Sequence, residues 1–559
     1  MYPCKKLEKH KKINFMKNIS KLIIVLLGLN LVLSSCGDDF LEEEIRSDFT
    51  PETLNDELGY KAQLIGLYQM LSTFETRSSD QGWLCVWQAG TDITWPTEPQ
   101  GIEVPYYKYN QLTTDDNAAY QSWQLWYNMV ENTNSIISSV ENNTSEELAQ
   151  EEKDAINAEA RFFRAYAYNN LATLFGGVPL ITEPVTEARF DYTRNSLEEI
   201  NAQIEEDLTF ATANLGEPTS APEFESRVNK YAAHQLFATF YLRSGQPDLA
   251  EDQADIIINS QAFQLVDERY GVKSSEPGDP FSDMFFKGNQ RRSQGNTEAI
   301  WVLENENPAD VRGGSSGNPQ HRRIWGAGYH NINGMIPADS LGGRGVARIR
   351  LNNWVIYDLY DDTDMRNSKY NIHRRFRYNN PASDFADIYG ELVPYTGIDT
   401  LSRIQPYTLK WGHFDPADVF GFGMWKDFIQ MRLGETYLLK AEAQVMQDNP
   451  GGAATTINIL RTRAEAPQVS AGEMDMDFIL DERVRELLAE ENRRMTLMRT
   501  KMLVERATRL NVQNPNIPLP QTMRIEGLQE FHELFPIPLR EIQLNKEAEL
   551  TQNPGYQGS

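Results

Sequence analysis

Cysteine is scarce in this sequence, whose 559 residues include only Cys4, Cys36 and Cys85. A disulfide needs two thiols in the same mature chain. Cys4 lies before a segment with the layout of an export signal and Cys36 directly after it, so Cys85 has no remaining partner if Cys36 is modified. We therefore expect an exported protein without internal disulfides, whose stability comes from its packed core.

Long apolar runs are also scarce. One run, Leu22–Leu33, follows two lysines and is closed by small residues. About a dozen mostly apolar residues are too few to span a bilayer as a helix, which takes about 20, but they suit a secretory signal. We expect residues 1–35 to be this signal, with Met16 as an alternative start that yields the same mature chain.

The predicted signal ends in Leu33-Ser34-Ser35-Cys36, which resembles the bacterial lipobox. In that motif cleavage precedes the cysteine, whose thiol and amine are then acylated, and two or more acyl chains anchor a protein stably. We expect lipidation at Cys36, followed by an acidic tether over residues 36–50. A plain signal peptide that happens to contain cysteine is the alternative.

Basic residues are outnumbered in this chain. There are 53 Lys and Arg against 80 Asp and Glu, which gives a formal net charge of −27. Nucleic acids and anionic membrane surfaces attract proteins through clustered Lys and Arg. Neither is expected as a partner, whereas neutral ligands and other proteins are.

Motifs for catalysis and metal binding are missing as well. The seven histidines are scattered, without H-E-x-x-H or a cysteine cluster, so we expect no zinc site. No G-x-x-x-x-G-K-[ST] loop is present. Residues 313–317 match the letters of a G-x-S-x-G elbow, but Asn318-Pro319 follows where a helix should begin. A glycosidase acid/base pair cannot be singled out among 80 carboxylates, and we predict no catalysis and no cofactor.

Two groups of acidic residues each lie close together in the sequence. One stretch of aspartates suggests a calcium loop but lacks the EF-hand glycine and closing glutamate, so calcium stays an alternative to no metal. Glu482, Glu486 and Glu490 share a helix face with arginines nearby, which we interpret as a solvated, salt-bridged surface. The aspartates are Asp358, Asp361, Asp362 and Asp364.

Apolar residues recur at helical spacing through the first part of the mature chain. The third helical stretch ends at Gly176-Gly177 with Pro179 just beyond, as helix C-termini often do. Ser196 with Glu199 three residues later forms a capping box for the fourth. The predicted helices cover residues 54–71, 118–140, 146–174 and 196–215.

Two later stretches each contain a pair of helices joined by a short turn. Residues 229–260 turn at Gly245-Gln246-Pro247, and residues 432–464 turn around Pro450. Small residues at the crossings let the helices approach closely, and the pattern resembles a tetratricopeptide unit of about 34 residues. Generic antiparallel helix pairs are the alternative.

Between residues 261 and 426 the helical signal fades and Gly, Pro, Asn and aromatics become frequent. A short strand at 298–304 and one helix near 351–360 interrupt it. We predict a mostly α fold, with tetratricopeptide-like helix pairs forming a scaffold for long loop-rich insertions and a few short strands. Residues 51–559 would form this single domain, with the main insertion at 261–426.

Four stretches together resemble one family. They are CGDDFLEEE from Cys36, AEARFFRAYAYNNLATLFGGVPLITEPV at 158–185, ILDERVRELLAEENRRMTLMRT at 479–500, and LFPIPLREIQLNKEAELTQNPGY at 534–556. The chain resembles the SusD/RagB family of Bacteroidetes surface lipoproteins from the tether to the C-terminus. It departs from the family pattern at Asn492 and Met495, where relatives tend to have glycine and an aromatic residue.

The resemblance implies an α-helical fold, a lipid-anchored position on the outer membrane facing the cell exterior, and a SusC-like TonB-dependent transporter as partner. It also implies binding of a glycan or similar nutrient, without chemistry. A lipid-anchored glycoside hydrolase and a structural lid without its own ligand site are the alternatives.

Candidate ligand contacts come from two aromatic loops, residues 82–110 and 321–333. A sugar ring stacks its C–H face on an aromatic plane, while its hydroxyls seek amide, carboxylate and guanidinium groups. Family ligand contacts tend to come from such loops, although these aromatics could simply pin the loops to the helices. The residues that we predict to bind ligand are Asp92, Trp95, Trp325 and Asn331.

Overall fold

The computed structural model describes most of the chain after the predicted tether. Signal, lipidation site and tether, together with residues 313–317, lie outside the described residues. The described ranges are 55–76, 80–221, 225–311, 319–511 and 524–556.

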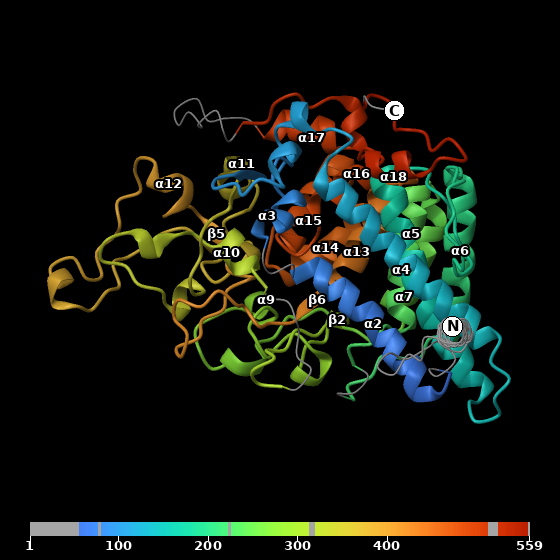
Figure 1. Cartoon of the computed structure of the whole chain (residues 1–559). Coiled ribbons are helices and arrows are strands. Elements are labelled where there is room, and N and C mark those ends of the chain that lie inside the picture. The colour runs from blue at the N-terminus through green and yellow to red at the C-terminus, as the bar shows by residue number, and fades with distance from the viewer. Residues whose placement is uncertain (1–54, 77–79, 222–224, 312–318, 512–523, 557–559) are drawn as a thin grey trace, which may run out of the picture. The chain divides into compact units, whose positions relative to one another are not determined.

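Long helices form the first part of the fold (Figure 1). The third of those predicted ends where Gly176 takes a φ of +74°, a conformation that glycine adopts without a Cβ penalty. The fourth begins with the predicted capping box, in which the Glu199 backbone N–H donates to Ser196 Oγ at 3.2 Å and the Ser196 N–H donates to the Glu199 carboxylate at 2.8 Å. These helices are α2 (Glu57–Thr76), α4 (Asn117–Glu141), α5 (Gln150–Phe175) and α6 (Leu197–Asn214).

Both predicted helix pairs are present. Gly245 ends the first helix of one pair with a φ of +78°, and Pro247 opens the next helix, where its missing N–H costs nothing. In the other pair, Asn449 Oδ1 accepts the Gly452 N–H at 3.0 Å and caps the second helix. The pairs are α7 (Lys230–Ser244) with α8 (Pro247–Asn259), and α13 (Leu433–Met446) with α14 (Pro450–Arg463).

The two pairs form a continuous row in space, although more than 170 residues separate them in the chain. Helix α13 packs on α8, and α15 (Met476–Leu487) packs on α13 in turn. The row starts with α2, α4, α5 and α6, each packed on its neighbour. The helical scaffold is therefore continuous in space, although the loop-rich insertion interrupts it in the chain. The prediction of a mostly α fold is confirmed.

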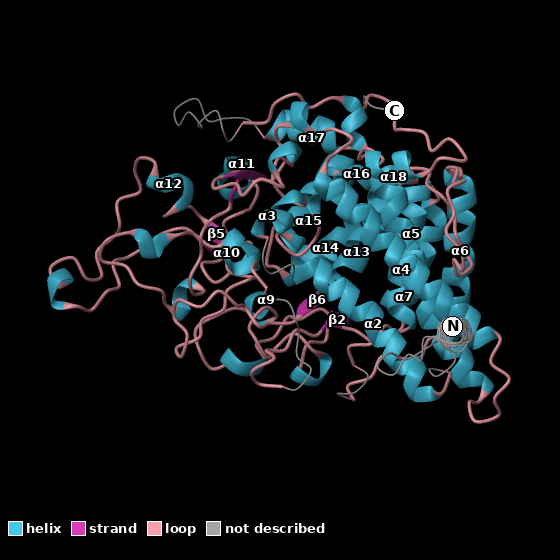
Figure 2. Cartoon of the chain, viewed as in Figure 1, coloured by secondary structure: helices cyan, strands magenta, loops and turns pink. Residues whose placement is uncertain are grey.

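The insertion between α8 and α13 consists mainly of loops (Figure 2). The predicted strand at 298–304 is β2 (Ala299–Leu303), which pairs antiparallel with β6 (Phe428–Arg432), and the predicted helix near 351–360 is α11 (Asn353–Tyr357). The other short elements of this region are α9 (Pro280–Asp283), α10 (His321–Trp325), α12 (Asp399–Ser402), β3 (Ile349–Leu351), β4 (Ile372–His373) and β5 (Tyr407–Thr408).

Elements outside the insertion complete the fold. Strand β1 (Thr94–Pro96) pairs antiparallel with β3, which joins the N-terminal aromatic loop to the insertion, and β4 pairs with β5 in the same sense. The remaining helices are α3 (Gln81–Val86), α16 (Arg493–Arg499), α17 (Leu503–Leu510) and α18 (Leu539–Leu544).

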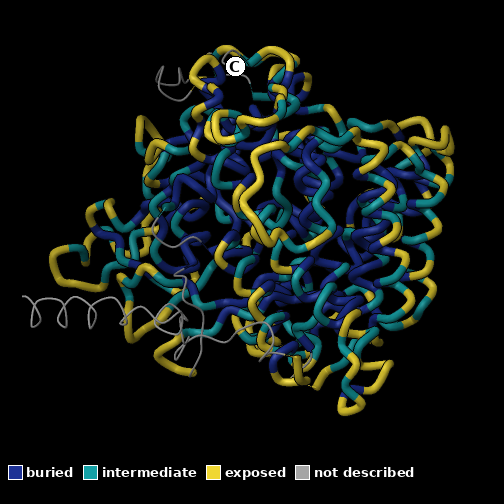
Figure 3. The backbone as a smooth tube through the Cα atoms, turned by 45° about the vertical axis from the view of Figure 1, so that its right-hand side comes forward, coloured by how far each residue is buried: buried dark blue, intermediate teal, exposed yellow. Residues whose placement is uncertain are grey.

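The buried core follows the helical row (Figure 3) and includes charged side chains. Glu486 of α15 is fully buried and accepts from Arg432 at 2.6 Å and from Arg366 at 3.0 Å, with Arg463 also bonded to it. Glu482 is equally buried and lies 2.9 Å from Arg461. The predicted ion pairs of these glutamates are present, but the predicted solvation of Glu482 and Glu486 is wrong, because arginines from other elements cover and neutralise this helix face.

The C-terminal segment, residues 534–556, is fastened to the end of α5. Asn553 Nδ2 donates to the carbonyls of Phe175 at 3.0 Å and Phe535 at 2.7 Å, and its Oδ1 accepts from Arg194 at 2.8 Å. Gln552 bonds both the N–H and the carbonyl of Ile537 at 2.7 Å. The closing motif noted in the sequence is thus a structural fastening.

Candidate ligand-binding site

Asp92 lies in the interior of the fold. Its side chain has no exposed surface, and its two oxygens accept from Arg493 at 2.9 and 2.6 Å and from Arg506 at 2.8 Å. Although burial alone would raise the pKa of Asp92, these two guanidinium groups hold it below its usual value. A ligand reaches this carboxylate only by displacing an arginine.

Trp95 belongs to β1 and is also buried, with 2% of its surface exposed. Leu401 packs against it, and the Arg350 guanidinium lies 5.0 Å from its ring. Its indole therefore packs the insertion against the N-terminal loop in this structure.

Trp325 and Asn331 have different surroundings. Trp325 ends α10 and lines a cavity between the insertion and the helical scaffold. Asn331 is exposed at the end of the short 3₁₀ helix Tyr329–Asn331. Three of the four predicted residues are thus buried, and of these only Trp325 lines the cavity, while Asn331 lies on the surface.

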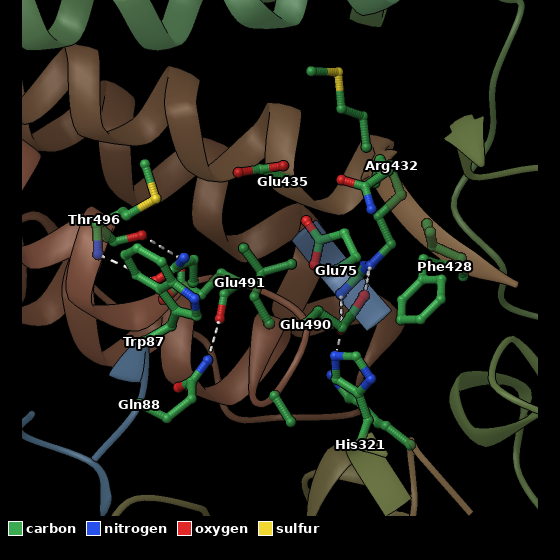
Figure 4. A pocket seen from close by; sticks show the side chains of 18 of the residues that line it. Glu75, Trp87, Gln88, His321, Phe428, Arg432, Glu435, Glu490, Glu491 and Thr496 are labelled. Carbon is green, nitrogen blue, oxygen red and sulfur yellow. Dashed lines mark hydrogen bonds and ion pairs between the residues drawn. The ribbon is translucent and has the colours of Figure 1, made fainter. Parts of the chain in front are cut away.

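The cavity has a volume of about 250 Å³ and is walled by aromatic side chains. Trp87, just after α3, packs 5.3 Å from Phe74 of α2 at one side. At the other, His321 of α10 stacks on Trp411 at 4.4 Å, and Phe428 of β6 lies 5.0 Å from His321. Figure 4 shows Trp87 and Gln88 across the cavity from His321 and Phe428.

Several buried polar atoms along this wall have no hydrogen-bond partner within the protein. They are Trp87 Nε1, Gln88 Oε1, His321 Nδ1 and one terminal nitrogen of Arg483. Each of these side chains lines the cavity and is more than nine-tenths buried. Because an unpaired buried polar group costs about 1–3 kcal/mol, these donors and acceptors are suited to a ligand that both donates and accepts.

Three ionisable groups of the cavity are shifted towards neutrality. Burial raises the pKa of Glu75 to about 7 and lowers the pKa of Lys426 to about 7 and of His321 to about 3. At neutral pH the histidine is uncharged, and the glutamate and the lysine are each only partly charged. Such a lining suits a neutral hydroxylated molecule better than an ion.

The fully ionised carboxylates of the cavity are already bound. Glu490 accepts from Arg432 at 2.7 Å and from Lys410 at 2.5 Å, and Glu491 accepts from Arg483 at 2.9 Å and Arg493 at 3.0 Å. Neither is available as the nucleophile or base that glycoside hydrolysis needs.

Two of the four aspartates considered for calcium are likewise engaged. Asp364 is buried and pairs with Arg366 at 2.8 Å, and Asp361 pairs with Arg461 at 3.0 Å. In the described ranges, no group of three His, Cys, Asp or Glu side chains is placed to hold a metal ion.

Sequence reasoning missed most of the cavity, because its walls come from segments far apart in the chain. Glu75, Gln88 and Glu491 carry no local signal of a shared site. One hint existed at the departure from the family pattern, since Asn492 and Met495 both line the cavity, and the Met495 N–H donates to Asn492 Oδ1 at 3.4 Å at the start of α16.

Comparison with known proteins supports one family. Residues 402–556 match the model of the SusD family, and residues 39–242 match a model described as starch-binding associating with outer membrane. SusD-like protein P25 of Formosa agariphila is 25% identical over 567 residues, covering 96% of this chain and 99% of the relative. SusD-like protein P2 of the same organism is 26% identical over 560 residues, covering 96% and 100%.

Solved structures share the fold. A SusD homolog from Bacteroides thetaiotaomicron superposes with a TM-score of 0.69 at 20% identity, covering 92% of this chain and 100% of its own. A laminarin-binding SusD-like protein superposes with a TM-score of 0.66 at 18% identity, covering 90% and 100%. Surface glycan-binding protein A from Bacteroides fluxus gives 0.66 at 20% identity with the same coverage.

The two family models leave residues 243–401 unmatched, a range that holds α8, α10 and most of the loop-rich insertion. Within the ranges that the structure describes, no helix combines the length and apolar character required to cross a membrane. The matched ends contain the helical row apart from α8, together with its C-terminal fastening. On this evidence the chain belongs to the SusD/RagB family.

Proposed function

We propose that this protein binds a glycan or a similar nutrient at the cell surface and passes it to a SusC-like TonB-dependent transporter. The observation that carries the binding step is the cavity, in which aromatic walls and unpaired polar atoms surround about 250 Å³. A hydroxylated ring matches both features, because its C–H faces pack on aromatic side chains and its hydroxyls form hydrogen bonds with the polar atoms. The laminarin-binding and surface glycan-binding proteins that share the fold support this ligand class.

Anchoring and location form the second part of the proposal. Acylation at Cys36 holds the protein on the outer membrane, and the acidic tether over residues 36–50 leads to the fold. The description of the matching model, starch-binding associating with outer membrane, supports this location. Fractionation of a Cys36→Ser variant tests the anchor, since full retention in the envelope would contradict lipidation at this thiol.

Trp87→Phe tests the cavity while keeping an aromatic ring at a buried position. The variant removes an N–H that has no partner in the protein. The smaller ring packs less fully against its neighbours, so we expect a loss of about 1–2 kcal/mol in the free energy of unfolding with the variant still folded. We also expect a roughly tenfold weaker oligosaccharide affinity, which corresponds to one lost hydrogen bond of about 1.4 kcal/mol. Titration calorimetry with a panel of neutral oligosaccharides measures the affinity.

Trp325→Leu tests the predicted ligand contact, with Tyr389→Ala as its control. Leucine fills space without offering a stacking plane, so we expect at least tenfold weaker binding. Tyr389 is 57% exposed and lies outside the cavity, so its removal should leave affinity unchanged. Equal affinity in wild type and the Trp325 variant would place the ligand elsewhere.

Catalysis is not part of the proposal, since the structural neighbours described as laminarin-binding and glycan-binding support binding alone. Incubation with polysaccharide extracts should release no shorter products. Co-purification from outer membranes tests the transporter partnership. A complex that assembles normally while the Trp325 variant loses ligand would argue against a purely structural lid.

A further inference from the structure

Two phenylalanines are exposed on a short loop of the insertion, and arginines hold that loop in place. Phe420 is 57% exposed and Phe422 is 50% exposed. Arg344 donates to the Phe420 carbonyl at 2.7 Å, and Arg322 donates to the Gly421 carbonyl at 2.7 Å. The aromatic rings are therefore presented to solvent on a fixed backbone.

Two guanidinium groups lie close to the ring of Phe422. Arg323 lies 4.4 Å and Arg344 5.2 Å from its centroid, and Arg344 Nε lies 3.4 Å from His330 Nε2. His330 in turn lies 6.4 Å from the Phe420 ring. We call this group the Phe–Arg patch. It consists of Arg322, Arg323, His330, Arg344, Phe420 and Phe422.

The cations of the patch have no carboxylate partners among the described residues. Arg322 donates only to carbonyls, those of His413, Gly421 and Arg344, while Arg323 donates to Gln320 Oε1 at 3.1 Å. Elsewhere in the described chain, arginines such as Arg366 and Arg432 each bind two or more acids. Positive charge is thus held here without a direct ion pair, although Asp415 and Asp418 act on Arg322 from nearby, in a protein with a net charge of −27.

Burial and the repulsion between neighbouring cations lower the pKa values of two side chains in the patch. Burial lowers the pKa of Arg323 to about 10, helped by Arg344, Arg348 and Arg322. It lowers the pKa of His330 to about 4, so this ring is neutral at pH 7. Arg323 Nε and His330 Nδ1 are buried and have no hydrogen-bond partner. The patch therefore has positive charge and unused polar groups beside exposed aromatic rings.

The local composition also favours an acidic ligand. Residues 319–426 contain thirteen Lys and Arg against eleven Asp and Glu, whereas acids predominate in the whole chain. The patch is distinct from the cavity, because His321 and Trp325 of α10 line the cavity while Arg323 of the same helix contacts Phe422.

We propose that the Phe–Arg patch is a second binding site, which takes an acidic saccharide through its carboxylate or sulfate group. The guanidinium groups of Arg323 and Arg344 bind the anionic group, since planar forked donors match such oxygens. Phe420 stacks on the C–H face of the sugar ring. The class "saccharide" rests on the proposed function, whereas the requirement for an anion rests on this patch alone.

Calorimetry with the full folded chain tests the proposal, using three oligosaccharide probes and one peptide. The probes are oligogalacturonate for carboxylate, a carrageenan oligosaccharide for sulfate, a neutral laminarin oligosaccharide, and polyglutamate. We expect at least one acidic saccharide to bind, with an affinity that falls as salt is raised because exposed charges are screened. Which acidic probe binds distinguishes carboxylate from sulfate.

Matched variants assign that binding to the patch. We expect Arg323→Ala and Phe420→Ala each to lower the affinity for the acidic saccharide at least tenfold. Arg344→Lys should weaken it several-fold, since lysine keeps the charge but loses the planar fork. Arg377→Ala removes one exposed arginine elsewhere in the insertion and should change affinity less than twofold. Unfolding midpoints confirm that each variant is folded.

Three outcomes would overturn the second site. They are no binding of either acidic saccharide, equal losses in Arg323→Ala and Arg377→Ala, and polyglutamate binding as tight as the acidic sugar. The Trp87→Phe and Trp325→Leu variants keep the tests apart, because they should weaken neutral oligosaccharides and leave the acidic probe unaffected. If the cavity proposal is wrong, only the measurements with the neutral laminarin oligosaccharide will differ from expectation.

Discussion

Replacing Asp92 with asparagine should destabilise the protein without touching a ligand contact. Asparagine keeps the shape of the side chain but removes the negative charge between Arg493 and Arg506, which are themselves fully buried. Breaking a buried ion pair by removing one partner costs about 3–5 kcal/mol. Each arginine keeps another acid, Glu491 for Arg493 and Asp481 for Arg506, so we expect the lower end, about 3 kcal/mol.

Urea unfolding followed by tryptophan fluorescence measures this loss. Asp387→Asn is the matched control, because Asp387 is exposed and should change the midpoint little. The pKa of Asp92 is lowered in the fold, so its stabilising contribution is present above the unfolded value of about 4 and is lost as pH falls through the folded value. The difference between wild type and Asp92→Asn should therefore be full at pH 7 and shrink in acid.

The opposite pattern would refute this reasoning. If Asp92→Asn unfolded at the wild-type urea concentration and bound oligosaccharide tenfold more weakly, Asp92 would be a ligand contact, and the buried geometry would not describe the binding-competent protein. Folded Asp92→Asn with wild-type affinity would instead assign the carboxylate to the fold.

Further predictions concern the cavity and the C-terminal fastening. Because burial raises the pKa of Glu75 to about 7, the fold loses stability as pH rises from about 4.5 to 7. Glu75→Gln should therefore raise the free energy of unfolding by about 3 kcal/mol at pH 8 and leave it unchanged at pH 4, as measured by urea titration at both values. Asn553→Ala strands two buried carbonyls and should lower the free energy of unfolding by about 3 kcal/mol, a figure that an unchanged midpoint would disprove. Gly555→Ala forces a Cβ against Phe531 at a φ of +94° and should lower the thermal midpoint, whereas Gly451→Ala, with open space around it, should not.

The sequence predicted the helical scaffold well because its signals are local. Apolar spacing, the Ser196 cap and the Gly245-Gln246-Pro247 turn lie within a few residues of the structure they specify. The α5 terminus at Gly176 was equally readable. Such features depend little on the rest of the fold, so one sequence suffices.

Burial of charge could not be predicted in the same way. Glu486 has the sequence context of a surface helix. It can be buried because Arg366, Arg432 and Arg463, which belong to other elements, form ion pairs with it. Asp92 follows the same logic, since its partners are about 400 residues away. Short strands such as β1 and β3 also depend on a distant partner.

The candidate sites were predicted only in part. Trp325 lies on the cavity and Asn331 on the surface, but the role of each as a ligand contact stays a prediction. The unpaired atoms of Trp87 and Gln88 become visible only when α2, α10 and β6 meet. The exposed rings of the Phe–Arg patch give no periodic signal, because they lie in a loop without repeating geometry.

The C-terminal fastening has a consequence for the order of events after synthesis begins. Asn553 bonds the end of a helix that is made 378 residues earlier, so that end of the scaffold cannot be locked before Asn553 itself has been made. Contacts this distant in the chain form late and slowly. The end of α5 is therefore fixed only at a late step of folding.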